Sequence, residues 1–229
     1  MSYAQKTYDT PDGMRIEELR QTCELFVVAG SETTATLLSG VTYLLSKNPE
    51  SYQKLVDEIR QAFDNEDQID ITNTSGLKYE SAVLEEALRM FPPVGGSQCR
   101  FTPPEGHTIS SQFVPGNAIV SVSQWSANRA SSHFRDSYQF IPERWLGDPK
   151  YKDDKRKAVQ PFSVGPRNCI GLNLAYAEMK VILARILWNF DFALCKESQD
   201  WMDRLKVYTL WMRKPMMVKL TPVVRGAVS

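Results

Sequence analysis

The stretch PFSVGPRNCIG, at positions 161–171, is the most informative part of this 229-residue chain. Cys169 lies directly before a long helical pattern, and the N-terminus of a helix favours a thiolate over a thiol. Arg167 lies nearby and favours the same charged form. Gly165 and Gly171 permit tight turns and the close approach of a flat ligand. The pattern therefore indicates a cradle for a stabilised thiolate, and the alternative is an inert buried cysteine at the start of a helix.

Five positions of this loop resemble the haem-binding loop of the cytochrome P-450 family: Phe162, Gly165, Arg167, Cys169 and Gly171. The resemblance implies that all five contribute to binding haem b. It also implies that Cys169 is the axial ligand of the haem iron and that Arg167 contacts a haem propionate. A cysteine thiolate in this position pushes electron density toward the dioxygen bond.

A second motif consists of Glu86 and Arg89, which are three residues apart and share one face of a predicted helix. Alone they would be an ordinary surface pair. With the later segment FIPERW, which contains Arg144, they resemble the ExxR helix and the PERF-type segment of the same family. The resemblance implies a buried charge network that locks the cysteine loop to the core. Because a buried guanidinium without partners is costly, we expect Glu86→Ala or Arg89→Ala to abolish folding and haem incorporation.

A third motif, AGSETT at positions 29–34, lies in the middle of a long helical pattern and resembles the oxygen-activation segment of the family. The resemblance implies that Glu32 is an acid and Thr33 an alcohol that together relay protons to dioxygen. It also implies that Gly30 leaves room for the ligand. The alternative is an ordinary helix whose polar residues face solvent. A helical glycine and a threonine that bonds back to a carbonyl both favour a local distortion.

Two further features carry weaker predictions. By resemblance, Arg100 binds a haem propionate, and a surface arginine is the alternative. The resemblance also implies that the segments 94–97 and 212–215 line the substrate pocket. Gly95 and Gly96 suggest room for a bulky substrate, although glycine in a turn explains them equally well.

Hydrophobic periodicity predicts helices at 14–45, 49–63, 77–91 and 172–188, with a loop at 64–76. Short strands are expected at 118–123, 205–211 and 216–220, the last two as a hairpin, and an irregular connector at 136–157. The fold class is mainly α with small β elements. By resemblance it is the C-terminal part of the cytochrome P-450 fold: long central helix, ExxR helix, cysteine-ligand loop and following helix, and terminal hairpin. Residues 1–229 are expected to be one partial domain, truncated at its N-terminus, because family members are much longer.

Composition excludes several other classes. Lys and Arg total 27 and balance 27 Asp and Glu, so no basic field favours nucleic acid. The four cysteines form no CxxC pair and the two histidines lack metal-ligand spacing, which disfavours zinc and disulfide frameworks. Cys23, Cys99 and Cys195 are expected to be buried as small apolar groups. The apolar stretches are too short for a membrane span.

The resemblance implies a haem-thiolate monooxygenase of fungal type that oxidises a lipophilic small molecule, such as a secondary metabolite, with O2. Electrons would come from NADPH through a reductase, which we expect to dock near Lys150–Lys157, although a merely solvated basic loop is equally consistent. The main alternative is a truncated, non-catalytic remnant that binds haem poorly. A cysteine hydrolase and a non-oxygenating haem-thiolate isomerase are further readings. The residues leave the location unknown: the resemblance implies the endoplasmic reticulum membrane, which is usual for eukaryotic members, and without an anchor in this chain the default expectation is the cytoplasm.

Overall fold

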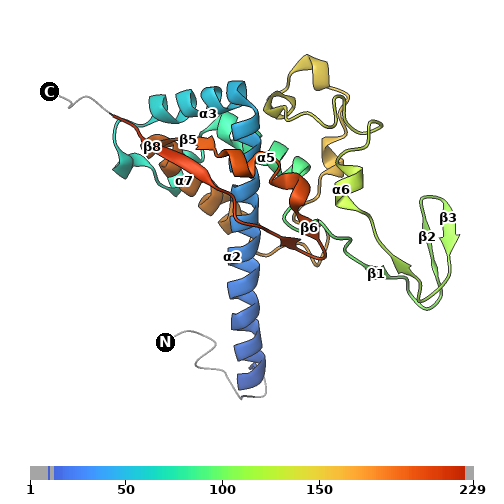
Figure 1. The fold of residues 1–229 in the computed structure, drawn as a ribbon. Coiled ribbons are helices and arrows are strands. Elements are labelled where there is room, and N and C mark those ends of the chain that lie inside the picture. Colours follow the sequence, from blue (N-terminus) through green and yellow to red (C-terminus); the bar gives the residue numbers. More distant parts are fainter. Residues whose placement is uncertain (1–9, 11–12, 225–229) are drawn as a thin grey trace.

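The computed structural model describes residue 10 and residues 13–224, and these form a mainly helical fold with short strands (Figure 1). The class predicted from the sequence is confirmed. The helices are α2 (Ile16–Lys47), α3 (Pro49–Ala62), α4 (Ile71–Thr74), α5 (Lys78–Met90), α6 (Gln124–Ala127) and α7 (Leu172–Asn189). The four long helices agree with the predicted ranges to within one turn.

One hydrophobic core holds the four long helices together. It is built from the C-terminal half of α2 and one face each of α3, α5 and α7, which present apolar side chains at helical spacing. Fully buried members include Leu37, Val41, Leu55, Ile59, Leu84, Leu88, Leu183 and Leu187. This core fixes the positions of α5, which carries the second motif, and of α7, which follows the cysteine loop.

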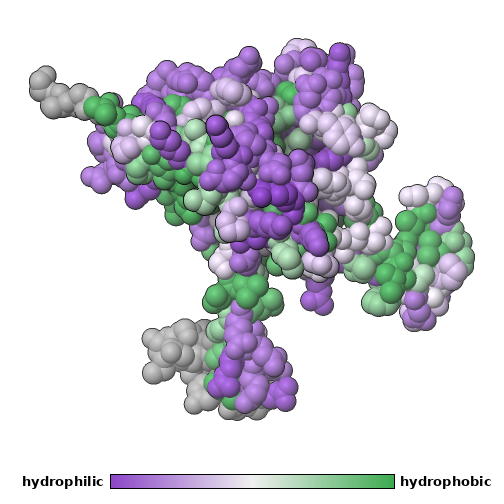
Figure 2. Space-filling view, in the orientation of Figure 1, coloured by the Kyte–Doolittle hydropathy of each residue, from purple (hydrophilic) through white to green (hydrophobic). Residues whose placement is uncertain are grey.

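The N-terminal half of α2 projects away from this core (Figure 1). Phe26 and Val27 lie on it with 58% and 69% of their surface exposed, and Figure 2 shows a hydrophobic band on this part of the helix. By length and composition, α2 is the one helix in the described part of the chain that would suffice to cross a membrane. Its C-terminal half belongs to the core. The side chains of Ser31 and Thr33 donate to carbonyls one turn earlier, yet the helix continues through them without interruption.

The strands form four two-stranded antiparallel sheets. In the first half, β1 (Arg100–Phe101) pairs with β4 (Ile119–Val120), and β2 (His107–Ile109) pairs with β3 (Gln112–Val114). The β2–β3 hairpin projects from the body on the opposite side from β8 (Val218–Pro222) (Figure 1). The strand expected at 118–123 is thus shortened to two residues.

The predicted terminal hairpin is wrong in its pairing. β8 (Val218–Pro222) pairs along its whole length with β5 (Phe190–Leu194), the strand that directly follows α7. β6 (Lys206–Val207) pairs instead with β7 (Trp211–Met212). The reason is that β5 is anchored on the core through the buried Phe192 and offers a five-residue edge, which is longer than the edge that β6 offers.

The connectors contain more local structure than the sequence indicated. The predicted loop at 64–76 holds a 3-10 turn (Glu66–Gln68) and α4, whose first turn is capped by the Asp70 side chain. The connector at 136–157 contains three 3-10 turns, at Pro142–Trp145, Pro149–Tyr151 and Arg156–Ala158. Two more lie at Lys196–Ser198 and Met202–Arg204.

The expected burial of three cysteines is also wrong. Cys23 and Cys99 are exposed and Cys195 is only partly buried. Cys23 lies on the projecting half of α2, away from the core, and Cys99 directly precedes the exposed strand β1. The residues next to Cys23 and Cys99 in the sequence are apolar enough to suggest burial. However, this half of α2 and strand β1 do not pack against the core.

Candidate functional site

Glu86, Arg89 and Arg144 meet in a network with no exposed side-chain surface. Both residues of the ExxR pair lie on α5, where the Arg89 guanidinium donates to both carboxylate oxygens of Glu86 at 2.7 and 2.8 Å. Arg144, from the 3-10 turn Pro142–Trp145, donates its Nε to Glu86 Oε1 at 3.0 Å. The structure therefore brings together the three residues that the sequence motifs singled out.

The remaining donors of Arg89 reach the backbone of the connector between α6 and that turn. Its Nη1 donates to the carbonyls of Asn128 and Ser137, at 2.8 and 2.7 Å, and its Nη2 donates to the carbonyl of Gln139 at 2.9 Å. Phe134 packs against the guanidinium. Arg89 thus ties three points of an irregular segment to α5, which explains how a connector with little regular structure keeps one path.

Two members of the network were missed by sequence reasoning. The indole nitrogen of Trp145 donates to Glu86 Oε2 at 2.9 Å, and the carboxylate of Asp154 accepts from Arg144 Nη1. Trp145 is the last letter of the FIPERW segment, so its place in the motif was an available signal. Asp154 had none, because it belongs to a charged stretch with several similar residues.

The cysteine loop is closed by backbone hydrogen bonds and faces outward. The amide of Cys169 donates to the carbonyl of Phe162 at 2.9 Å, and that of Asn168 donates to the carbonyl of Gly165 at 3.0 Å. Gly165 has a φ of +81°, which favours glycine. Gly171 is the N-cap residue of α7. The turn therefore presents the Cys169 thiol at the start of a long helix, where the side chain is exposed.

The residues around this thiol fit a flat, apolar iron porphyrin. A thiolate at a helix N-terminus is a suitable donor for haem iron. A Cβ built on Gly165 would meet no atom within 4 Å, and Val164, Ile170 and Leu174 expose most of their surface beside it. Arg167 is exposed as well, and its guanidinium has no partner among residues 13–224. Donor, apolar surface and free cation are the groups that a dicarboxylate porphyrin requires.

The third motif lies in the middle of α2, where the projecting half meets the half that belongs to the core. The Thr33 hydroxyl donates to the carbonyl of Ala29 at 2.7 Å, and a Cβ on Gly30 would meet no atom within 4 Å. Glu32 forms an ion pair of 2.6 Å with Arg213, which directly follows β7. Sequence reasoning missed Arg213, since the two residues are 181 positions apart.

The weaker predictions have mixed outcomes. Arg100 is exposed at the start of β1, and its guanidinium donates to the carbonyl of Cys99 at 2.9 Å. The suggested room at Gly95 and Gly96 is absent: a Cβ would lie 2.7 Å from a methyl group of Val207 at the first and 2.3 Å from the carbonyl of Tyr208 at the second. Close packing of the β6–β7 hairpin explains these glycines.

The basic segment Lys150–Lys157 is partly engaged within the protein. Lys150 pairs with Asp136 at 3.3 Å, and the Arg156 guanidinium donates to the carbonyl of Arg144. Lys152, Lys155 and Lys157 are exposed. The segment thus contributes to the support of the network as well as to the surface charge.

Comparison with known proteins identifies the family. The sequence model described as "Cytochrome P450" matches residues 1–220. This covers nearly the whole chain, including the cysteine loop, the ExxR helix and the FIPERW segment. The chain belongs to the cytochrome P450 family, and this membership implies a haem cofactor.

Several curated fungal relatives are similar along most of the chain. The cytochrome P450 monooxygenase aclL of Aspergillus oryzae is 47% identical over 211 residues, which are 92% of this chain and 43% of the relative. The monooxygenase astA of Talaromyces wortmannii is 46% identical over 97% of this chain and 45% of its own. The trichothecene C-15 hydroxylase of Fusarium sporotrichioides is 45% identical over 91% and 43%. The chain spans less than half the length of these relatives.

Proposed function

We propose that this chain is the haem-ligating, C-terminal part of a fungal-type haem-thiolate monooxygenase, with residues 1–229 belonging to one family domain. The observation that carries the proposal is the exposed Cys169 thiol at the start of α7. The loop that presents this thiol leads directly into α7. The same core holds α7 and α5, and α5 carries the buried Glu86 network. An isolated reactive cysteine would need no such support.

Haem b would be held by residues that the structure leaves exposed. Cys169 would ligate the iron, while Arg167 and Arg100 would pair with the propionates, since a guanidinium suits a carboxylate. Phe162, Gly165 and Gly171 shape the loop that meets the porphyrin face. When bound, the haem supplies the activation of dioxygen and the insertion of one oxygen atom into the substrate.

The chain's own contribution to proton movement would come from α2. Glu32 carries the carboxylate and Thr33 the hydroxyl of a relay, in which an acid and a nearby alcohol pass protons inward. Gly30 adds no side chain to the space beside them. Arg213 holds the Glu32 carboxylate by the 2.6 Å ion pair and thereby fixes where the relay begins.

Thr33→Ala tests this assignment. The relay would be broken while the helix gains a better helix former, so we expect product formed per NADPH consumed to fall several-fold with no loss of stability. The matched control is Ser31→Ala, which removes the equivalent bond to the carbonyl of Val27. An unchanged yield per NADPH in Thr33→Ala would contradict the assignment.

The substrate we propose is a lipophilic natural product. The relatives include an enzyme named as a trichothecene hydroxylase and several monooxygenases from filamentous fungi. Electrons would come from an NADPH-dependent reductase docking near Lys150–Lys157, where exposed lysines remain for an acidic partner.

The decisive experiment is the carbon monoxide spectrum of the reduced chain after expression with haem available. We expect a thiolate-type, red-shifted Soret band that disappears in Cys169→Ala and persists in Cys195→Ala, whose cysteine lies outside the loop. Folded protein that never takes up haem would instead support the alternative of a non-catalytic chain with impaired haem binding.

A further inference from the structure

A chain of contacts connects the cysteine loop to the ExxR helix independently of the Glu86 network. The carbonyl of Phe162 accepts from the amide of Cys169, and the Phe162 ring packs against the ring of Tyr176, with centroids 5.3 Å apart. The Tyr176 hydroxyl, on α7, donates to Glu85 Oε1 on α5 at 2.7 Å. The first contact closes the loop, the second joins the loop to α7, and the third joins α7 to α5.

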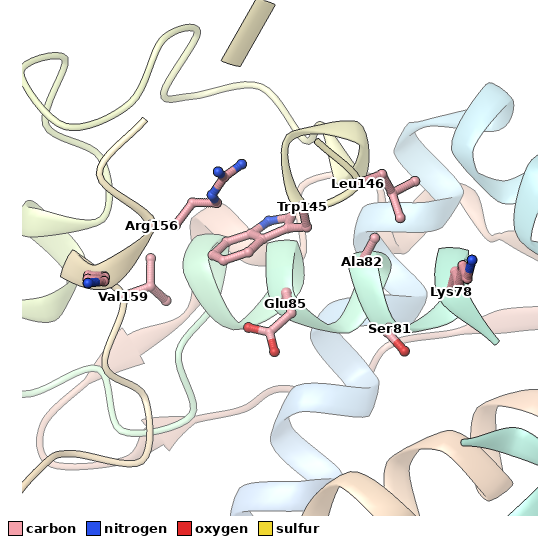
Figure 3. A pocket seen from close by; sticks show the side chains of 9 residues that line it. Lys78, Ser81, Ala82, Glu85, Trp145, Leu146, Arg156 and Val159 are labelled. Carbon is pink, nitrogen blue, oxygen red and sulfur yellow. The ribbon is translucent and has the colours of Figure 1, made fainter. Parts of the chain in front are cut away.

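Glu85 lies at a cavity of about 490 Å³ on the outer side of α5 (Figure 3). Ala82, Trp145 and Val159 give the cavity apolar walls, and Arg156 lies at its edge. Figure 3 shows Trp145 and Glu85 among the side chains that line this cavity. Glu85 is therefore not a freely solvated surface acid. Its role differs from that of its neighbour Glu86, which holds the main network.

Partial burial determines which group is the donor in the hydrogen bond between Tyr176 and Glu85. Burial raises the pKa of the Glu85 carboxyl, which the hydrogen bond from Tyr176 counteracts. Burial, together with the charge of Glu85, raises the pKa of Tyr176. The tyrosine therefore keeps its proton at neutral pH and remains the donor.

Glu85 and Glu86 thus anchor different segments to successive positions of α5. Glu86 holds the connector through Arg144 and Trp145, whereas Glu85 holds α7 through Tyr176. Of these two contacts, the one between Glu85 and Tyr176 continues to the cysteine loop, since the Tyr176 ring packs against Phe162. We propose that Tyr176 and Glu85 are positioning residues that set the place of the cysteine loop relative to α5 and so hold Cys169 where it coordinates.

This inference rests on the proposed haem-thiolate function, but it is tested in the haem-free chain as well. Tyr176→Phe keeps the ring against Phe162 and removes only the hydroxyl. In the full haem-free chain we expect amide hydrogen exchange at Asn168 and Cys169 to rise about five- to tenfold, the range for one lost hydrogen bond. In the haem-loaded chain we expect part of the thiolate-type carbon monoxide band to shift to the thiol type.

The matched control is Tyr79→Phe. Tyr79 also lies on α5 and also donates to a glutamate, Glu143, at 3.1 Å, but that bond leads away from the loop. We expect this variant to leave both the loop exchange and the spectrum unchanged. Glu85→Gln keeps an acceptor for Tyr176 and should behave like the wild type, whereas Glu85→Leu should behave like Tyr176→Phe.

Two results would overturn the proposal: wild-type loop exchange in Tyr176→Phe, or an equal rise in Tyr79→Phe, which would indicate general loosening. If Tyr176→Phe does not fold, the pair of Glu85 variants makes the same comparison. If the wild type itself takes up no haem, the proposed function fails, and the exchange rates of the haem-free chain still decide whether the two residues position the loop.

Discussion

The charge network and the cysteine loop both come from family motifs, yet they occupy opposite environments. Glu86, Arg89 and Arg144 have no exposed side-chain surface, and their partners are protein groups. In the cysteine loop, residues 164–170 are all exposed, and Ile170 exposes 92% of its surface. The difference separates two roles: the network stabilises the fold, whereas the loop presents groups to a ligand. Substitutions in the two regions should therefore have separable effects on folding and on haem binding.

The largest expected effect is that of Glu86→Ala. It removes the acceptor for Arg89, Arg144 and Trp145 at once. Breaking a buried pair leaves uncompensated charges, so we expect a loss of about 3–5 kcal/mol in the free energy of unfolding. A loss of this size abolishes folding when the total stability is near the lower end for a domain, about 5 kcal/mol. Urea denaturation measures it, with the exposed Glu50→Ala on α3 as the control. A variant with an unchanged unfolding midpoint would show that the network does not stabilise the fold.

Asp154→Ala should have a smaller effect of the same sign. Its carboxylate accepts from Arg144 Nη1 and from the amide of Arg135, the latter at 2.8 Å. Arg144 keeps its bond to Glu86, so we expect a loss of about 1.5–3 kcal/mol, the range for hydrogen bonds to charged groups. Asp153→Ala, at the exposed neighbouring position, is the control. Equal unfolding midpoints for Asp154→Ala and Asp153→Ala would show that Asp154 does not stabilise the network.

Asp154 also marks the limit of prediction from sequence. Helical periodicity identified α2, α3, α5 and α7, because one apolar face must be buried whatever the rest of the chain does. Glu86, Arg89 and Arg144 followed from motifs with fixed spacing. Asp154 lies in an irregular connector, where its partner depends on the path that the backbone takes.

The same reason explains the other misses. A strand pairs with the edge that the tertiary structure places beside it. For this reason β8 pairs with β5 and not with β6, which is nearer in the sequence. Gly95 and Gly96 looked like open space, but what fills the space comes from a hairpin more than 100 positions later. The ion pair of Glu32 with Arg213 likewise joins distant segments. Local patterns do not contain such contacts.

Glu80→Leu sharpens the comparison, because Glu80 is buried like the network but lacks its partners. Its side chain is fully buried, and within residues 13–224 neither carboxylate oxygen has a hydrogen-bond partner. An unsatisfied buried polar group costs about 1–3 kcal/mol. We therefore expect Glu80→Leu to raise the free energy of unfolding by about 1–2 kcal/mol, and a loss of stability would contradict the cost assigned to the unpaired carboxyl.

The pH dependence of that gain gives a second measurement. Burial, above all, raises the pKa of Glu80 well above its ordinary value. Between the ordinary pKa and the raised one, the folded state binds a proton that the unfolded state has released, so stability falls as the pH rises through this window. Glu80→Leu should remove this fall, and its advantage over the wild type should grow with pH. An advantage that is constant from acidic to neutral pH would contradict the raised pKa.

Cys169→Ala should have the smallest effect on stability and the sharpest effect on function. The thiol is exposed, and the loop bonds to Phe162 and Gly165 are made by backbone groups that alanine retains. We therefore expect the free energy of unfolding of the haem-free chain to change by less than about 0.5 kcal/mol, while the thiolate-type spectrum disappears. Set beside Glu86→Ala, this outcome would show that the network stabilises the fold, whereas the Cys169 thiol serves the ligand and not the fold. A haem-free Cys169→Ala chain that unfolds as readily as Glu86→Ala would mean that the thiol is part of the structural support, and the division between the two regions would be wrong.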